Sequence, residues 1–405
     1  MERVFIAALA AALLVSSAGR VWAETRSLTL ESALALARQR APELAAARAR
    51  IAEAEGRLRG ASVALRDNPR VEGLAGSTIG ESASSLVEIN LWQPFELGGR
   101  RSARMRAARA GIAREAANAE VTRQRVVRDV ALAFVSALHA RATVELAATA
   151  EALAARTLAV AERRQKAGEV GKLETNVLAS ALSRARAERR HAEVDVARAQ
   201  ARLRLLLDFP PGDRLLLRGK LDDALRFEPT PPGGRERAEL RAARAELAEA
   251  EAEAELGRGT RWPDMALGVR YRRENGENGV LGGLAFTLPL FERGQGPTAE
   301  ASARRDRAAL ELGALRRSIA IESASSGDVS RSLVAAAREL GTTALPLAEE
   351  NSRLAERAYA AGEIGLTDLL AIQRESLTAG RAYVDALLEA AVANIERRAA
   401  RGELR

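Results

Sequence analysis

The sequence predicts a mainly α-helical chain with a small β part, in which one plan is written twice. Three observations support this prediction. The 405 residues are 47% apolar, but only 3% are aromatic and 29% are charged. This composition is typical of long helices with narrow contact seams, since a compact core of this length would need more large apolar residues. Short motifs recur in order at offsets of 194 to 196 residues, and two stretches of alternating apolar and polar residues interrupt the helical pattern.

Charge and residue usage exclude several classes of function. The 62 Lys and Arg outnumber the 54 Asp and Glu, giving a net charge of +8, but the two signs are interleaved along the chain. A nucleic-acid surface would be segregated and basic, so we expect no nucleic-acid partner. The absence of cysteine excludes disulfide scaffolds and thiolate sites. No catalytic or phosphate-binding motif appears, and His139 and His191 have no partner at ligand spacing. We therefore expect no enzyme activity, no cofactor and no resident metal site.

Residues 1–23 have the pattern of a cleavable secretory signal peptide. Arg3 precedes an apolar run from Phe5 to Val15, and Ala23 completes a cleavage-site pattern before Glu24. The apolar run is too short to span a bilayer. Because no cysteine follows the cleavage site, we expect the exported chain not to be lipidated.

Landmarks of the first half of the mature chain return in the second half. The glycine-containing segment 167–171 returns as 361–365, and Leu91–Glu96 returns as Thr287–Glu292. A duplication explains these recurrences better than coincidence does. The two copies are then 24–208 and 235–405, joined by a proline-rich linker or equatorial segment at 209–234.

Each predicted copy consists of a helix, two strands, a very long helix, a tight tip and a returning helix. In the first copy these are helix 30–66, a β-hairpin at about 70–94, helix 98–165, tip 167–171 and helix 172–207. In the second copy they are helix 236–258, a β-hairpin at about 264–290, helix 296–360, tip 361–365 and helix 366–402.

Individual residues refine this plan. Val127, Val130, Phe134 and Ala137 are spaced as in a coiled-coil seam, and Pro346 should kink or break the second long helix. Glycines are predicted to form the turns that lead from each second strand into the long helix, because glycine adopts backbone angles closed to other residues. These strand-to-helix turn residues are Gly98, Gly99, Gly294 and Gly296.

The predicted strands alternate as transmembrane β-barrel strands do. Val87, Ile89 and Leu91 alternate with Glu88 and Asn90, which suits one face toward lipid and one toward water. A soluble β-ribbon with one buried face would alternate in the same way.

The ends and edges of these strands carry further predictions. Asn275–Gly279 is a strong turn signal in the second hairpin, and Trp92 and Trp262 are placed where interfacial aromatic residues occur. Four strands cannot close a barrel alone, and lipid does not tolerate open sheet edges. Other copies of the chain must therefore contribute strands, and three copies would supply twelve.

With its signal peptide, duplicated plan and two glycine tips, the chain resembles the TolC-like outer-membrane efflux family over nearly its whole mature length. The run Glu96-Leu97-Gly98-Gly99-Arg100 is most similar to the heavy-metal-efflux branch. The resemblance implies a homotrimer with a twelve-stranded β-barrel in outer-membrane lipid and a helical α-barrel in the periplasm. It also implies a periplasmic adaptor protein and an inner-membrane pump as partners in tripartite efflux.

The resemblance also implies roles for the tips and for one acid. The adaptor would dock on tip residues Gly168, Val170, Gly171, Gly362, Ile364 and Gly365. Asp368 would form an acidic ring at the channel entrance, while its first-copy counterpart, Asn176, is uncharged. Other interpretations remain open. The tips would also suit plain helix turns without a partner, and Asp368 would also suit a helix N-terminus for electrostatic reasons.

Two classes of function remain at this point. The first is a passive outer-membrane channel for heavy-metal cations, drugs or a secreted polypeptide. The second is a structural or adaptor-like periplasmic coiled-coil protein, which would need no lipid-facing strands.

Overall fold

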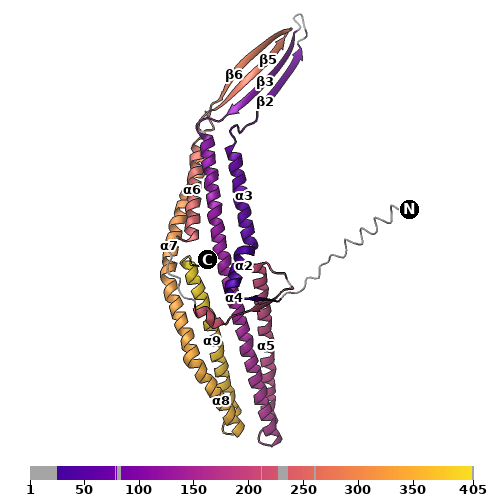
Figure 1. The fold of residues 1–405 in the computed structure, drawn as a ribbon, viewed down its shortest axis with the longest axis vertical. Coiled ribbons are helices and arrows are strands. Elements are labelled where there is room, and N and C mark those ends of the chain that lie inside the picture. Colours follow the sequence, from indigo (N-terminus) through magenta and orange to yellow (C-terminus); the bar gives the residue numbers. More distant parts are fainter. Residues whose placement is uncertain are drawn as a thin grey trace, which may run out of the picture.

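The structure is a computed structural model that describes residues 25–77, 79, 84–210, 212–226, 236–259 and 261–403. The predicted signal peptide at 1–23 lies outside these residues. The molecule is elongated, with a four-stranded sheet at one end, two helical hairpin tips at the other and a two-stranded sheet between them (Figure 1). The prediction of a mainly helical chain with a small β part is confirmed.

The first half of the chain contains β1 (Thr25–Leu28), α2 (Leu30–Arg40), α3 (Pro42–Ser62), β2 (Arg70–Ser77), β3 (Ser85–Phe95), α4 (Arg100–Lys166) and α5 (Lys172–Leu207). Between the halves lie β4 (Arg214–Leu217) and the 3-10 helix η1 (Leu221–Arg226). The second half contains α6 (Ala238–Gly259), β5 (Asp264–Glu274), β6 (Glu277–Thr287), α7 (Gln295–Glu339), the π-helical turn η2 (Leu340–Ala344), α8 (Leu345–Ala361) and α9 (Leu366–Ala400).

The first predicted helix, 30–66, is divided in two, so its continuity was wrongly predicted. Ala41 has extended backbone angles (φ −54°, ψ 125°) and Pro42 is the first residue of α3. Proline disfavours helical angles in the residue before it and suits the first helical position, where no N–H bond is needed. On the other side, Thr29 and Ser32 form a capping box that starts α2.

The second long helix, which was predicted to kink or break at Pro346, changes to a π-helical turn before this residue and keeps helical backbone angles on both sides. The π-helical turn Leu340–Ala344 separates α7 from α8, and Pro346 lies in the first turn of α8. Proline has no N–H to donate to the helix, and a π turn is one way to absorb that loss. Gly341 also permits a close helix contact here, since a Cβ at this position would lie 2.5 Å from the ring of Tyr383 on α9.

The larger sheet joins the two halves of the chain. Its strands are antiparallel in the order β2-β3-β5-β6, so the central pair, β3 with β5, has one strand from each half. The β5–β6 turn is shorter than the predicted 275–279. Only Asn275 and Gly276 form it, with φ of 53° and 86°, and residues from Glu277 onward belong to β6. Two consecutive positive φ values are those of a type I′ hairpin turn.

The middle of the molecule has a compact core that the composition did not predict. β1 pairs in parallel with β4, and β4 lies inside the segment expected to be a linker. Buried side chains from α2, α4, α5 and α9 pack around this pair. The predicted seam lies in this core, with Val127, Val130, Phe134 and Ala137 each at most 2% exposed. Local enrichment of Val, Leu and Phe here is diluted in the composition of the whole chain.

The two long helical runs have different neighbours. α4 contacts α2, α3, α5, α6 and α9, whereas α7 contacts α6 and α9 besides η2, which continues it. Judged by length and composition, α4 is the one helix among the described residues that could cross a membrane. Its apolar residues 126–138 instead form part of the central core.

Candidate functional site

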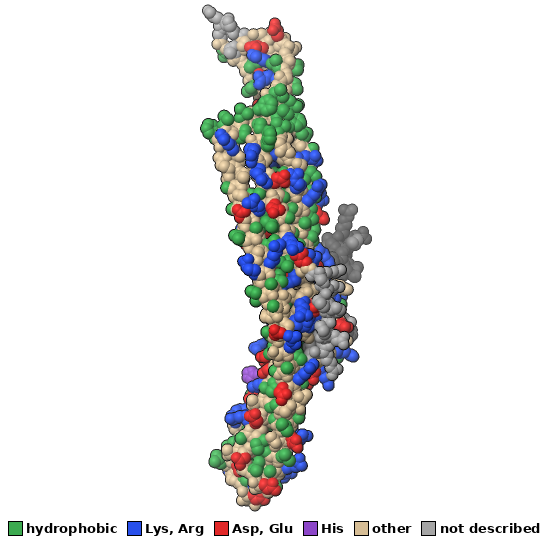
Figure 2. All heavy atoms as spheres, turned by 90° about the vertical axis from the view of Figure 1, so that its left-hand side faces the viewer, with side chains coloured by type: hydrophobic (Ala, Val, Ile, Leu, Met, Phe, Trp, Pro, Cys, Tyr) green, Lys and Arg blue, Asp and Glu red, His purple; other side chains and the backbone are tan. Residues whose placement is uncertain are grey.

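One face of the four-stranded sheet is apolar and uncovered. The strand register places Ile89 opposite Tyr271 and Leu91 opposite both Val71 and Val269, so their side chains share this face. Apolar side chains on it are between 42% and 73% exposed; they are Val71, Val87, Ile89, Leu91, Leu267, Val269, Val280, Leu284 and Phe286. Figure 2 shows hydrophobic side chains gathered in a band over this end of the molecule. An exposed apolar surface of this extent marks a contact with a membrane or another protein.

The opposite face of the sheet is polar and internally bonded. The Arg270 Nε donates to the Asn90 Oδ1 at 2.8 Å and lies 3.2 Å from the Glu88 carboxylate. The Asn90 amide donates to the same carboxylate at 3.0 Å, and Asn90 is 4% exposed. This network crosses the β3–β5 seam, so it links the two halves of the chain. The sheet therefore separates a polar face from an apolar face, as the alternation predicted.

Trp92 lies on the polar face, so its predicted place among interfacial aromatics is wrong. Its ring covers two glycines of neighbouring strands: a Cβ at Gly268 would lie 2.4 Å from it, and one at Gly283 would lie 2.8 Å from it. An aromatic ring over a strand glycine fills the space that the glycine leaves. The alternation itself contains this answer, because Trp92 follows Glu88 and Asn90 at intervals of two.

The glycines between strand and helix differ in what they do. Gly99 and Gly294 occupy equivalent positions as left-handed N-caps of α4 and α7, with φ of 71° and 72°. Gly98 also has a positive φ, and a Cβ there would lie 2.4 Å from the Trp262 ring. Gly296 was wrongly assigned to this turn, because it lies within the first turn of α7 without a positive φ.

The two hairpin tips have the same backbone design. Gly168 and Gly362 have φ of 80° and 81°. The N–H of the next residue, Glu169 or Glu363, donates to the carbonyl five residues back at 2.9 Å. This is the Schellman motif, in which a left-handed glycine ends a helix. Gly171 and Gly365 then begin α5 and α9 with extended angles.

A set of side-chain contacts that sequence reasoning missed links the two tips. The Arg164 guanidinium donates to the Tyr359 carbonyl at 3.0 Å and lies 5.0 Å from the centre of the Tyr359 ring. The Tyr359 hydroxyl donates to the Glu174 carboxylate on α5. Tyr359 is 1% exposed, and burial together with the Glu174 hydrogen bond raises its pKa to about 12. No local pattern signals these contacts, because Tyr359 lies 195 residues from Arg164 and 185 from Glu174.

The predicted gate residue, Asp368, lies in the first turn of α9 beside the second tip. It is exposed, and no ion pair to it is found among the described residues. Its position suits the favourable interaction of a carboxylate with a helix N-terminus. Asn176 lies near the start of α5 and is also exposed. The remaining tip residues are exposed or partly buried, with Ile364 packing against the small core around Tyr359 and Leu369.

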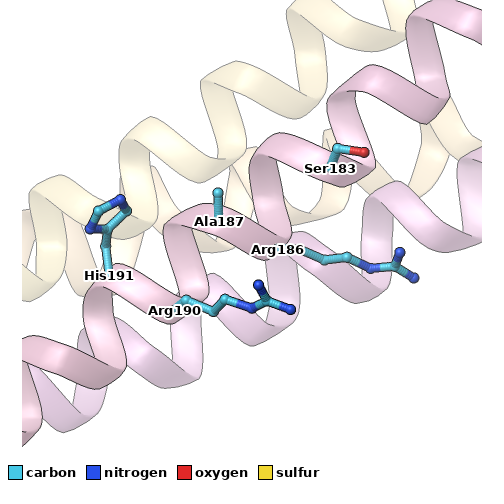
Figure 3. A pocket seen from close by; sticks show the side chains of 5 residues that line it. All are labelled: Ser183, Arg186, Ala187, Arg190 and His191. Atoms are coloured by element: carbon cyan, nitrogen blue, oxygen red, sulfur yellow. The ribbon is translucent and has the colours of Figure 1, made fainter.

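The two histidines lie in different surroundings. The His139 Nε2 on α4 lies 2.8 Å from the Asp385 carboxylate on α9. His191 lies with Ser183, Arg186, Ala187 and Arg190 along one side of α5, bordering a shallow groove with two arginines and no carboxylate (Figure 3). Within the described ranges, no group of three or more His, Cys, Asp or Glu side chains is placed to hold a metal ion.

Comparison with known proteins places these features in context. The model of the family described as outer membrane efflux protein matches residues 33–208. The chain is 32% identical to the cobalt-zinc-cadmium resistance protein CzcC of Cupriavidus metallidurans, over 89% of this chain and 86% of that protein. It is 31% identical to the nickel-cobalt-cadmium resistance protein NccC of Alcaligenes xylosoxydans xylosoxydans, over 62% and 60%. Its fold is similar to that of the Campylobacter jejuni CmeC outer membrane channel, with a TM-score of 0.76 at 16% identity over 92% and 85% of the two chains.

Proposed function

The chain belongs to the outer membrane efflux protein family, and on this premise we propose that three copies form one passive channel through the outer membrane. It is not an enzyme, in keeping with its family. The observation that supports the trimeric channel most directly is the sheet, which has an exposed apolar face, a bonded polar face and two free edges, β2 and β6. A soluble protein has no reason to leave such a face uncovered.

The free edges supply a way to close the barrel. In lipid, each unpaired backbone N–H or C=O costs several kcal/mol, so open sheet edges do not occur there. Pairing β6 of one copy with β2 of the next removes both edges. Three copies then give a closed barrel of twelve strands, and bacterial outer-membrane barrels have an even number of strands. The apolar face would contact lipid and the Glu88–Asn90–Arg270 network would face the water-filled interior.

The helical part of the molecule suits a periplasmic duct that ends at the tips. The helices run away from the sheet to the two tips (Figure 1). The Schellman turns leave Gly168, Gly171, Gly362 and Gly365 on the surface, so we propose that these tips, with Val170 and Ile364, dock onto a periplasmic adaptor protein. The adaptor would connect the channel to an inner-membrane pump, which supplies the energy that this chain has no means to generate.

We propose divalent metal cations as the cargo. Two relatives that are 32% and 31% identical to this chain over the aligned residues are named as cobalt-zinc-cadmium and nickel-cobalt-cadmium resistance proteins. In a trimer, the exposed Asp368 carboxylates at the second tip would form an acidic ring that favours cations at the entrance. The metal would pass through without a resident site.

The membrane part of this proposal is tested by moving charge onto each face of the sheet. Ile89→Arg and Phe286→Arg place a charge on the apolar face, where the cost is about 2 to 4 kcal/mol at mid-membrane. Leu74→Arg is the matched control, since Leu74 is similarly exposed but lies opposite Glu88 on the polar face. We expect the first two variants to lose assembled channel from the outer membrane and the control to keep it. Equal yields for all three would instead favour a periplasmic coiled-coil protein.

The cargo is tested with a host that carries a cobalt-zinc-cadmium pump and adaptor but lacks its own outer-membrane channel. We expect this chain to restore metal resistance, and Asp368→Asn to lower that resistance while the amount of channel stays unchanged. Asn176→Ala, at the counterpart position, is the control and should have no effect. Full resistance with Asp368→Asn would show that the acidic ring does not contribute to metal export. No resistance with the unchanged chain would show that metal cations are not its cargo.

A further inference from the structure

The connection between β6 and α7, residues 288–294, exposes a cluster of large apolar side chains. Leu288 is 62% exposed, Leu290 is 61% exposed and Phe291 is 91% exposed. The connection continues directly from the apolar face, since Leu284 and Phe286 of β6 precede it at 64% and 55% exposure. It lies where the sheet meets the helices, so the apolar surface extends past the last residue of the strand toward the helical part.

Several backbone groups of this connection are bonded to the connection itself or to the first residue of α7. The Leu290 N–H donates to the Leu288 carbonyl at 2.9 Å. The Leu290 carbonyl accepts from the Arg293 Nε at 3.0 Å, and the Phe291 carbonyl accepts from the Gln295 side-chain amide at 3.0 Å. A backbone group that enters lipid without a partner is costly, so irregular segments there must satisfy their own bonds. The bonds at Leu288, Leu290 and Phe291 lower that cost, while the apolar side chains of the connection stay exposed.

The equivalent connection in the first half behaves differently, although its sequence is similar. Phe95 corresponds to Phe291, but it pairs with Met265 across the β3–β5 ladder and is only partly exposed. Glu96 is held by Arg104 at 2.7 Å, with both side chains at most 15% exposed. The exposure of Phe291 is therefore a property of the edge strand and does not follow from the shared plan.

We propose that residues 288–291 are a membrane anchor that inserts Leu290 and Phe291 among the acyl chains of the periplasmic phospholipid leaflet. The inference rests on the proposed function, which places the apolar face in the outer membrane and the helices in the periplasm. Glu292 and Arg293 follow the inserted residues and lie at the depth of the lipid headgroups. Two further apolar residues near the junction of sheet and helices are exposed, Leu65 at 48% and Trp262 at 54%.

Site-directed spin labelling tests this anchor in the complete mature protein. The chain has no cysteine, so Phe291→Cys carries a single nitroxide. Val269→Cys, on the apolar face, is the membrane reference. Glu363→Cys at the second tip, where the side chain is exposed, is the aqueous reference. Each labelled protein is reconstituted into phospholipid vesicles, and the collision rates of the nitroxide with oxygen and with a water-soluble nickel chelate are measured.

We expect the ratio of oxygen to nickel collisions at position 291 to be several-fold higher than at 363 and close to that at 269. A ratio at 291 equal to that at 363 would show an aqueous connection and overturn the anchor. Low collision rates with both reagents would show that a neighbouring copy covers Phe291, which also overturns it. If position 269 itself is open to the nickel chelate, the barrel is not in the membrane and the proposed function fails instead.

Discussion

The two long helices that follow the strands, α4 and α7, occupy equivalent places in similar plans but have different environments. In the first half, α4 contacts five other α-helices. In the second half, α7 contacts α6 and α9 besides η2, which continues it. Leu310, Ile321 and Val329 are at least 51% exposed along α7. Within the helical part, α4 is therefore the internal framework, while α7 offers a surface that other copies are proposed to cover.

The largest expected effect separates the two long helices by one identical substitution. Leu138 on α4 is 4% exposed and Leu310 on α7 is 75% exposed. Leu138→Ala leaves a cavity in the core and should lower the free energy of unfolding by about 2 to 5 kcal/mol. Leu310→Ala should change it by less than about 0.5 kcal/mol in the dissociated monomer. Denaturant unfolding in detergent measures both, and comparable losses would contradict the division into framework and surface.

The link between the halves at the tips should give the next largest effect. Tyr359→Phe removes the hydroxyl that donates to Glu174, and a hydrogen bond to a charged group contributes about 1.5 to 3 kcal/mol. We expect the free energy of unfolding at neutral pH to fall by a value in that range. Glu174→Gln keeps a hydrogen-bond acceptor but loses the charge, so it should cost less than Tyr359→Phe. No cost at all for Glu174→Gln would show that the charge is irrelevant.

The same tyrosine predicts a dependence on alkaline pH. Its pKa is raised to about 12 in the folded chain, above the usual value of about 10 for an exposed tyrosine. The folded state therefore holds this proton more tightly, so the added stability is complete below about pH 10 and is lost as pH rises toward 12. Unfolding measured between these limits should show a smaller loss in Tyr359→Phe. A residual slope is expected from Tyr383, whose pKa is also raised by burial and by Asp222.

The tip glycines should give the smallest effects and should separate folding from docking. Gly168→Ala and Gly362→Ala force a Cβ into a left-handed conformation and should each cost about 1 to 2 kcal/mol. Gly171 and Gly365 have negative φ; an added Cβ would meet nothing at Gly171 and only the Asp368 Oδ2, at 3.9 Å, at Gly365. Alanine at either position should therefore change stability by about 1 kcal/mol or less. Calorimetric titration of Gly171→Ala and Gly365→Ala with the adaptor then measures the docking affinity without a large change in folding stability. Unchanged affinity in that pair, with a bulkier Gly171→Leu also neutral, would remove these positions from the interface.

Local patterns were sufficient to predict much of the fold. The alternation at Val87–Leu91 predicted the two faces of the sheet, and the spacing from Val127 to Ala137 predicted a buried seam. The pairing of β1 with β4 was missed because each strand has four residues and one of them lies within a proline-rich segment. The contacts of Trp92 with glycines and of Arg164 with Tyr359 join residues far apart in the sequence, so no local pattern could reveal them.

The functional positions depend on features that a single chain does not contain. Gly99 and Gly294 could be identified because a left-handed cap leaves a local glycine signal, whereas Gly296 has the same residue type without that role. The docking residues at the tips and the gate at Asp368 involve other molecules or other copies of the chain, so they stay predictions.

If this chain assembles through its sheet into an outer-membrane channel, its assembly state in the cell should show it. Membranes of cells that express the full chain are separated, the outer membrane is extracted with detergent, and the mass of the purified particle is measured by light scattering corrected for bound detergent. We expect a particle of three copies in the outer-membrane fraction. A monomer recovered from the soluble periplasmic fraction would mean that the chain forms no such channel.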